Sequence, residues 1–182
     1  MARGISTLFR VTARTFVVFT GVLALVGLLA FGLLSKGEPA LAVGDSIPDA
    51  ELPTLDGSGT GSIADYRGDW VLVNVWASWC DPCREESPAL QRFYEEHRAD
   101  GFTVLGIDSR DVSEDGLEFV EELGLTYPQL HDGEGERPDE LGMTGFPESF
   151  LVDPEGEVAL IRTGPVTTEY LNAEIAPLIG GS

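Results

Sequence analysis

The sequence predicts an α/β domain that follows one N-terminal membrane-spanning helix. Residues 15–34 carry no charge, which predicts the spanning helix. Two short apolar segments, residues 71–75 and 102–108, read as buried strands, and each precedes a segment with helical periodicity. This order implies a parallel strand pair with a right-handed crossover, and residues 150–161 add an antiparallel hairpin. We therefore expect a central mixed sheet flanked by helices.

Charge is distributed unevenly along the chain. The 182 residues include 31 acidic and 11 basic side chains, for a net charge of −20. All the acidic residues lie beyond Gly37, together with only seven of the basic ones. Such a surface repels nucleic acid, which excludes that class of partner. A solvated, soluble face explains the acidity, and a high-salt habitat is the other interpretation.

The N-terminal region predicts a membrane anchor. Residues 15–34, at about 1.5 Å each, extend over roughly 30 Å, the thickness of bilayer hydrocarbon. Three arginines and no acid precede this run, which places the N-terminus in the cytoplasm and the bulk of the chain outside. A signal peptide cleaved after Ala40-Leu41-Ala42 is the alternative, but the apolar run exceeds the usual length of about 7–15 residues. We expect the following parts: a cytoplasmic tail at 1–14, an anchor at 15–34, a linker at 35–44 and a folded domain at 45–182.

A CxxC motif lies where the first apolar strand gives way to a helix. Pro82 favours the first helical turn, because its φ is fixed and its missing N–H is not needed there. Cys80 then lies at the helix N-terminus, with Cys83 one turn inside. Free backbone N–H groups and the helix dipole should lower the pKa of Cys80 below that of a free thiol. This arrangement predicts thiol–disulfide exchange, in which Cys80 attacks and Cys83 resolves the mixed disulfide.

Two other interpretations of the cysteine pair are weaker. A structural disulfide across so short a loop would constrain the unfolded chain little. A zinc site could use Cys80, Cys83 and His97, but no fourth ligand follows His97 at the required spacing, and His131 lies far along the chain. We expect neither a metal nor a cofactor.

The helix after the motif carries a buried stripe. Its members recur at spacings of three and four residues: Cys83, Glu86, Leu90, Phe93 and His97. Glu86 should therefore lie among apolar groups beside Cys83 with a raised pKa, which suits proton exchange with thiols. The alternative is a carboxylate that rotates out to solvent. His97 should be partly buried and without a catalytic role.

The remaining helices and strands follow from shorter patterns. Beyond residues 102–108, a helix should run from Ser113 to Leu123, with Leu117, Val120 and Leu123 directed inward. Its first residues, Ser113 to Asp115, provide the cap.

Further along, residues 127–131 predict a short strand and residues 132–140 an acidic surface segment, with His131 exposed at its border. A last helix should cover residues 168–179. Before the first strand of the sheet, residues 45–68 predict an extension made of a strand, a Gly-rich turn and one helical turn.

The apolar strand, Trp79-Cys80-Asp81-Pro82-Cys83 and Pro88 together resemble the thioredoxin superfamily. With the N-terminal extension, the resemblance narrows to the membrane-tethered TlpA, ResA and CcmG (DsbE) group and covers residues 43–182. Thioredoxin has a buried Asp where this chain has Asn74. Glu86 matches an acidic residue of the ResA and CcmG group, and this leaves it as the proton-transfer candidate.

The resemblance also implies a client-binding surface. In thioredoxin-like folds the proline at the position of Pro147 is cis and faces the CxxC motif. The backbone of Phe146 would then be free to pair with an extended client chain. Pro147 followed by Glu148 is similar to the CcmG pattern. The expected client-binding residues are Trp79, Phe146, Pro147 and Glu148.

By this resemblance the protein would be an extracytoplasmic thiol–disulfide oxidoreductase held at the cell membrane. It would reduce client proteins such as apocytochrome c during cytochrome c maturation, with electrons from a membrane dithiol carrier of the CcdA or DsbD type. Asp81 supports this direction, because a negative charge beside the Cys80 thiolate holds its pKa up. A general extracytoplasmic disulfide oxidoreductase and a tethered binding or chaperone module are the alternatives.

Overall fold

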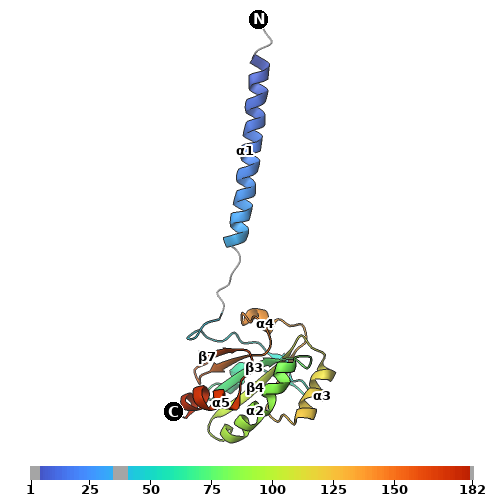
Figure 1. The fold of residues 1–182 in the computed structure, drawn as a ribbon, viewed down its shortest axis with the longest axis vertical. Coiled ribbons are helices and arrows are strands. Elements are labelled where there is room, and N and C mark those ends of the chain that lie inside the picture. Colours follow the sequence, from blue (N-terminus) through green and yellow to red (C-terminus); the bar gives the residue numbers. More distant parts are fainter. Residues whose placement is uncertain (1–4, 35–40, 181–182) are drawn as a thin grey trace. The chain divides into compact units, whose positions relative to one another are not determined.

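The computed structural model describes residues 5–34 and 41–180. Its contacts divide the chain into two units, residues 1–39 and 40–182. The first unit contains helix α1, Ile5–Leu34 (Figure 1). Among the described residues, no helix is long and apolar enough to cross a membrane.

Much of the predicted N-terminal organisation falls on residues that are not fully described. The side chains of the predicted tail and of the end of the predicted anchor, residues 30–34, lie outside the described ones, as does most of the predicted linker. The anchor and the domain limits therefore stay predictions.

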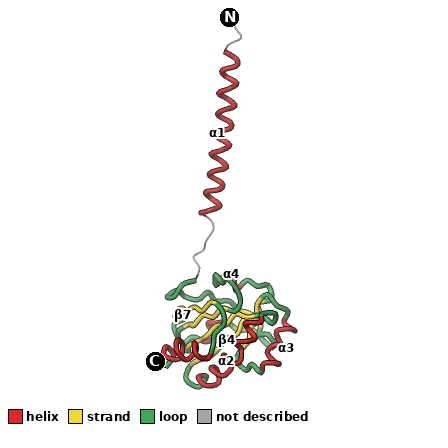
Figure 2. Tube along the Cα trace, viewed as in Figure 1, coloured by secondary structure: helices red, strands yellow, loops and turns green. Residues whose placement is uncertain are grey.

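A five-stranded mixed sheet organises the second unit, in the order β5-β4-β3-β6-β7 (Figures 1 and 2). Parallel pairing joins β3 to β4 and β4 to β5, whereas β6 pairs antiparallel with both β3 and β7. This arrangement confirms the predicted parallel pair and the predicted hairpin. The strands are β3 Trp70–Trp76, β4 Phe102–Ser109, β5 Gln129–Asp132, β6 Glu148–Val152 and β7 Val158–Thr163.

Helices connect and cover these strands. The longer helices of this unit are α2, Asp81–His97, and α3, Ser113–Leu123, and a short helix α4, Arg137–Glu140, precedes β6. The C-terminal helix begins after Thr167, whose hydroxyl accepts a hydrogen bond from the Tyr170 amide at 3.1 Å. It is made of three segments: α5 Thr168–Tyr170, a π-helical turn η2 Leu171–Ile175, and α6 Ala176–Ile179.

An N-terminal extension precedes the sheet, as predicted. Strands β1, Leu52–Pro53, and β2, Thr60–Gly61, form a small antiparallel pair, and the 3-10 helix η1, Ile63–Tyr66, follows. Two isolated bridges tie the extension to the main sheet: Ser46 pairs with Glu157, and Thr54 pairs with Leu130.

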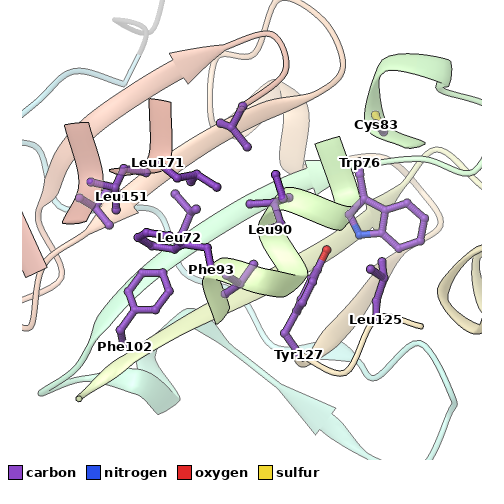
Figure 3. Packing of buried hydrophobic residues seen from close by; sticks show 14 of the residues in the cluster. Leu72, Trp76, Cys83, Leu90, Phe93, Phe102, Leu125, Tyr127, Leu151 and Leu171 are labelled. Atoms are coloured by element: carbon purple, nitrogen blue, oxygen red, sulfur yellow. The ribbon is translucent and has the colours of Figure 1, made fainter. Parts of the chain in front are cut away.

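Buried side chains fill both faces of the sheet, because successive strand residues point to opposite sides. Val71, Val73 and Val75 belong to one core cluster. Leu72 and Trp76 belong to the other, together with Leu90 and Phe93 of α2 (Figure 3). Helix α2 therefore packs on the face that carries the even-numbered residues of β3.

The predicted inward face of α3 is confirmed for Val120 and Leu123, which pack against the core, and is wrong for Leu117. Leu117 is 39% exposed, whereas Gly116 and Phe119 are buried. The ring of Phe119 stacks on that of Trp76, with 4.6 Å between the ring centroids. An aromatic pair buries more apolar area than one leucine could here, so it sets the rotation of the helix.

Two predictions around β5 are also wrong. His131 is not an exposed loop residue: it lies in β5, and its side chain is only 19% exposed. The segment that follows is not simply a surface, because Asp132 and Arg137 are buried. The Asp132 carboxylate accepts hydrogen bonds from the Ser109 hydroxyl at 2.7 Å and from the Arg137 amide at 3.0 Å. These bonds draw the start of α4 inward.

Candidate functional site

The two cysteines lie at the start of α2 and are joined by a disulfide, with their Cα atoms 5.3 Å apart. Cys80 is the N-cap residue, and its Sγ accepts a hydrogen bond from the Cys83 amide at 3.2 Å. Cys80 is 5% exposed and Cys83 1%. The predicted placement is confirmed: a helix-terminal N–H points at the sulfur of Cys80, where it would stabilise a thiolate.

An exposed aromatic surface flanks the disulfide. The Trp79 side chain is 58% exposed, and its ring lies edge-on to that of Phe146 at 5.3 Å. The Trp79 indole N–H donates to the carbonyl oxygen of Arg110 at 3.1 Å. The peptide bond between Phe146 and Pro147 is cis, as the resemblance implied. Trp79, which precedes Cys80, thus contacts Phe146, which precedes the cis proline Pro147. The role of these three residues in client binding stays a prediction.

Glu148 occupies a different position from the other predicted client-binding residues. Its side chain is buried in β6. One carboxylate oxygen accepts a hydrogen bond from the Thr163 hydroxyl at 3.1 Å, and the other accepts one from the Thr144 amide at 3.3 Å. Glu148 therefore ties the loop before Pro147 to β7, and its role in client binding stays a prediction.

Glu86 lies one helical turn beyond Cys83 and is 2% exposed, so the alternative of a solvated carboxylate is wrong. The Asn74 amide group donates to its Oε1 at 2.8 Å, and the Val166 backbone N–H donates to its Oε2 at 2.7 Å. Asn74 also donates to the Ser149 hydroxyl at 3.0 Å. The sequence showed Asn74 only as a departure from thioredoxin and gave no indication that it binds Glu86.

Burial raises the pKa of Glu86 to about 7, against the opposing effects of the Val166 amide, the Asn74 amide and the Arg162 guanidinium. A carboxyl group with this pKa exists in both protonation states near neutral pH. It is therefore suited to give and take protons beside a dithiol that alternates between thiol and disulfide.

Known proteins resemble this chain in sequence and in fold. A family model described as AhpC/TSA family matches residues 43–161. The chain belongs to this family.

Curated relatives and solved structures agree on the activity. The chain is 31% identical to the thiol-disulfide oxidoreductase ResA of Geobacillus thermodenitrificans, over 91% of this chain and 94% of the relative. It is 34% identical to the thiol:disulfide interchange protein DsbE of Allochromatium vinosum, over 86% and 87%. The crystal structure of a secreted thiol-disulfide isomerase from Corynebacterium glutamicum superposes with a TM-score of 0.68 at 28% identity, covering 80% of this chain and 95% of that one.

These relatives confirm the predicted resemblance to thioredoxin-like, ResA- and DsbE-type proteins. This member of the AhpC/TSA family is a thiol–disulfide oxidoreductase, and Cys80 and Cys83 form its CxxC pair.

In this oxidoreductase a row of five aligned positions, four of them polar, crosses the sheet. Five residues share one register position, one from each strand: Gln129, Gly106, Asn74, Ser149 and Arg162. The Gln129 side chain lies over Gly106, where a Cβ atom would collide with it, and accepts a hydrogen bond from the Trp76 indole at 3.0 Å. Sequence reasoning missed this row, because only strand pairing aligns residues so far apart along the chain.

Proposed function

We propose that this oxidoreductase works outside the cytoplasm as a reductant of disulfides in client proteins, such as apocytochrome c during cytochrome c maturation. The observation that carries the direction is the acidic surrounding of the dithiol. Asp81 follows Cys80 directly, Glu86 lies one turn beyond Cys83, and the Asp111 carboxylate binds Ser78, two residues before Cys80.

Acidic neighbours favour a reducing couple for an electrostatic reason. A negative charge near Cys80 destabilises its thiolate and so raises the pKa of the thiol. A less stable thiolate makes the reduced state less favourable, and the couple then gives up electrons more readily. The resemblance to ResA and DsbE proteins supports the same direction.

The location and the electron donor belong to the same proposal. The arginines before residue 15 and the charge-free run at 15–34 support an anchor with residues 45–182 on the extracytoplasmic side. A reductant in that compartment needs electrons from across the membrane, and a dithiol carrier of the CcdA or DsbD type would supply them.

Trapping of clients tests the proposal. In the full chain, Cys83→Ser should stall the mixed disulfide on Cys80, because the resolving thiol is gone. We expect covalent adducts that dithiothreitol releases, among them apocytochrome c. The matched control is Cys80→Ser, which should trap nothing. Adducts with other secreted proteins but never with apocytochrome c would replace the proposed client with a general one.

A second measurement addresses the direction and the alternative of a binding module. The wild-type protein should be mainly reduced in cells and become oxidised when the membrane carrier is deleted. It should also reduce insulin with turnover. A protein that stays oxidised in the presence of the carrier would contradict the reducing role, and absence of insulin reduction would favour a tethered binding module.

A further inference from the structure

A second buried acid, Asp108, lies at the end of β4 with no exposed surface. Strand pairing places it in register with Trp76 on β3 and with His131 on β5. Its Oδ2 lies 2.8 Å from His131 Nδ1. Its Oδ1 is buried as well and receives no hydrogen bond from an N–H or hydroxyl group of the described residues. A buried carboxyl oxygen without a donor is costly, so its surroundings require an explanation.

A glycine on α3 makes room for this carboxyl. A Cβ atom at Gly116 would lie 2.7 Å from Asp108 Oδ2 and 3.1 Å from its Cγ. Glycine within a helix costs roughly 0.5–1 kcal/mol relative to alanine. The fold therefore gives up some helix stability at α3 to hold a carboxyl against the end of β4.

A side-chain hydrogen bond links Asp108 to Asp111. Asp111 in turn binds the loop that carries Cys80. The Asp111 carboxylate accepts hydrogen bonds from the Ser78 amide at 2.5 Å and from the Ser78 hydroxyl at 3.0 Å. The bond from Trp79 to the Arg110 carbonyl joins the same two loops. Arg110 has a φ of 56°, unusual for a non-glycine residue, so its surroundings hold it in place.

Asp108 is buried and Asp111 is half-buried. Two ionised carboxylates in contact repel each other and neither can donate a hydrogen bond, so the pair favours a state in which one of them is protonated. Burial, followed by the charge of Asp111, raises the pKa of Asp108 to about 8. Burial also opposes ionisation of Asp111, but the bonds from Ser78 and Val112 more than offset this and lower its pKa. Near neutral pH the proton therefore belongs to Asp108. The other titratable groups around it are His131 and Asp132 from β5 and Asp115 from α3.

We propose that Asp108 is a positioning residue of the dithiol site, which donates a hydrogen bond to Asp111 and thereby holds the Ser78–Cys80 loop in place. Asp108 acts through Asp111 and Ser78 and does not act on the sulfur atoms itself. When it loses its proton, two adjacent negative charges repel and the loop loosens. This positioning role requires only the exchange activity, whichever client the protein acts on and in whichever direction.

The amide proton of Ser78 reports both the protonation of Asp108 and the order of the Ser78–Cys80 loop. In NMR spectra of the full chain in detergent micelles, its chemical shift should change in one step near pH 8, and its hydrogen exchange should lose protection above that step. Asp108→Asn keeps a donor and removes the ionisation, so the step should vanish while protection persists. The matched control is Asp115→Asn, which removes a nearby charge and should keep the step but move it to slightly lower pH.

A second variant separates positioning from packing. Asp108→Ala removes the donor, and the protection of the Ser78 amide should fall at least tenfold at pH 6. Glu86→Gln should leave the Ser78 step unchanged, because the hydrogen bonds of Glu86 go to Asn74 and Val166. A step that persists in Asp108→Asn, or full protection of Ser78 in Asp108→Ala, would overturn the proposal.

Discussion

Glu86 of α2 and Asp108 of β4 are two buried acids, and they differ in how their carboxyl oxygens are hydrogen-bonded. Each oxygen of Glu86 accepts an N–H, one from Asn74 and one from Val166. Asp108 has one oxygen bound to His131 and one without a donor. Burial raises the pKa of both, to about 7 for Glu86 and about 8 for Asp108. Directed N–H groups thus leave Glu86 able to ionise near neutral pH, whereas Asp108 keeps its proton.

The largest expected effect is on stability against pH. Both acids have folded-state pKa values above their unfolded ones, so the folded state binds more protons and stability falls as pH rises from about 4 to about 8. Between these pH values the free energy of unfolding of Glu86→Gln should fall by roughly 3 kcal/mol less than that of the wild type. For Asp108→Asn the difference from the wild type should be larger. Urea unfolding at pH 5 and pH 9 measures the difference. The control is Glu85→Gln, which changes an exposed neighbour. If the wild type and all three variants showed the same pH dependence, neither buried acid would have a raised pKa.

Variants of the two acids should differ most clearly in how the rate of thiol–disulfide exchange depends on pH. With Glu86 as the proton-transfer group, the rate should show a step near pH 7, and Glu86→Gln should lose the step and slow exchange by about 10- to 100-fold. Asp108→Asn should retain the step, because it leaves Glu86 and its donors untouched. Exchange with a small disulfide, followed against pH, provides the measurement. Superimposable profiles for wild type and Glu86→Gln would reduce Glu86 to a structural residue.

Packing around Asp108 gives a smaller effect. Gly116→Ala should destabilise the domain by about 1–3 kcal/mol, because the new methyl group meets the Asp108 carboxyl. Combined with Asp108→Ala, which frees that space, the same substitution should cost less. Gly59→Ala is the control, since a Cβ atom there meets nothing within 4 Å. Additive costs in the double variant would show that the carboxyl does not fill the space.

The smallest expected effect concerns the hydroxyl of Ser78. Ser78→Ala removes one hydrogen bond to Asp111 and should cost about 0.5–1 kcal/mol, because the shorter bond from the Ser78 amide remains. Thermal unfolding of the oxidised protein is sufficient to measure it. Ser113→Ala, at the start of α3, serves as the control. A decrease of more than about 3 kcal/mol in the free energy of unfolding would mean that the Ser78 hydroxyl, and not its amide, mainly holds the loop to Asp111.

The burial of Glu86 and its position near the dithiol could be predicted from the sequence. Most of the surroundings of Asp108 could not. Glu86 lies one helical turn from Cys83, so helical periodicity alone placed it beside the dithiol and predicted its burial. Asp108 and His131 come from different strands, and only the pairing of β4 with β5 brings them together.

The errors have similar causes. The acidic residues after His131 predicted an exposed side chain. Its partner, Asp108, lies on β4, far away along the chain. In α3, the predicted stripe included Leu117 and omitted Phe119. The Trp76 ring on β3 packs on Phe119, and this contact leaves Leu117 exposed. Short-range patterns thus predicted the helices and strands, and long-range pairing decided which side chains they bury.

The N-terminal extension has a consequence for solubility. Strands β5 and β7 end the sheet on either side, and such strands present free N–H and C=O groups that can recruit another molecule. The extension pairs beside both: Gly44 donates to the Val158 carbonyl at 2.8 Å, and Leu55 donates to the Gln129 carbonyl at 3.0 Å. One short segment of the chain thus covers part of both edge strands, where pairing with a strand of another molecule would begin. Its detachment would expose both at once and open a route to self-association.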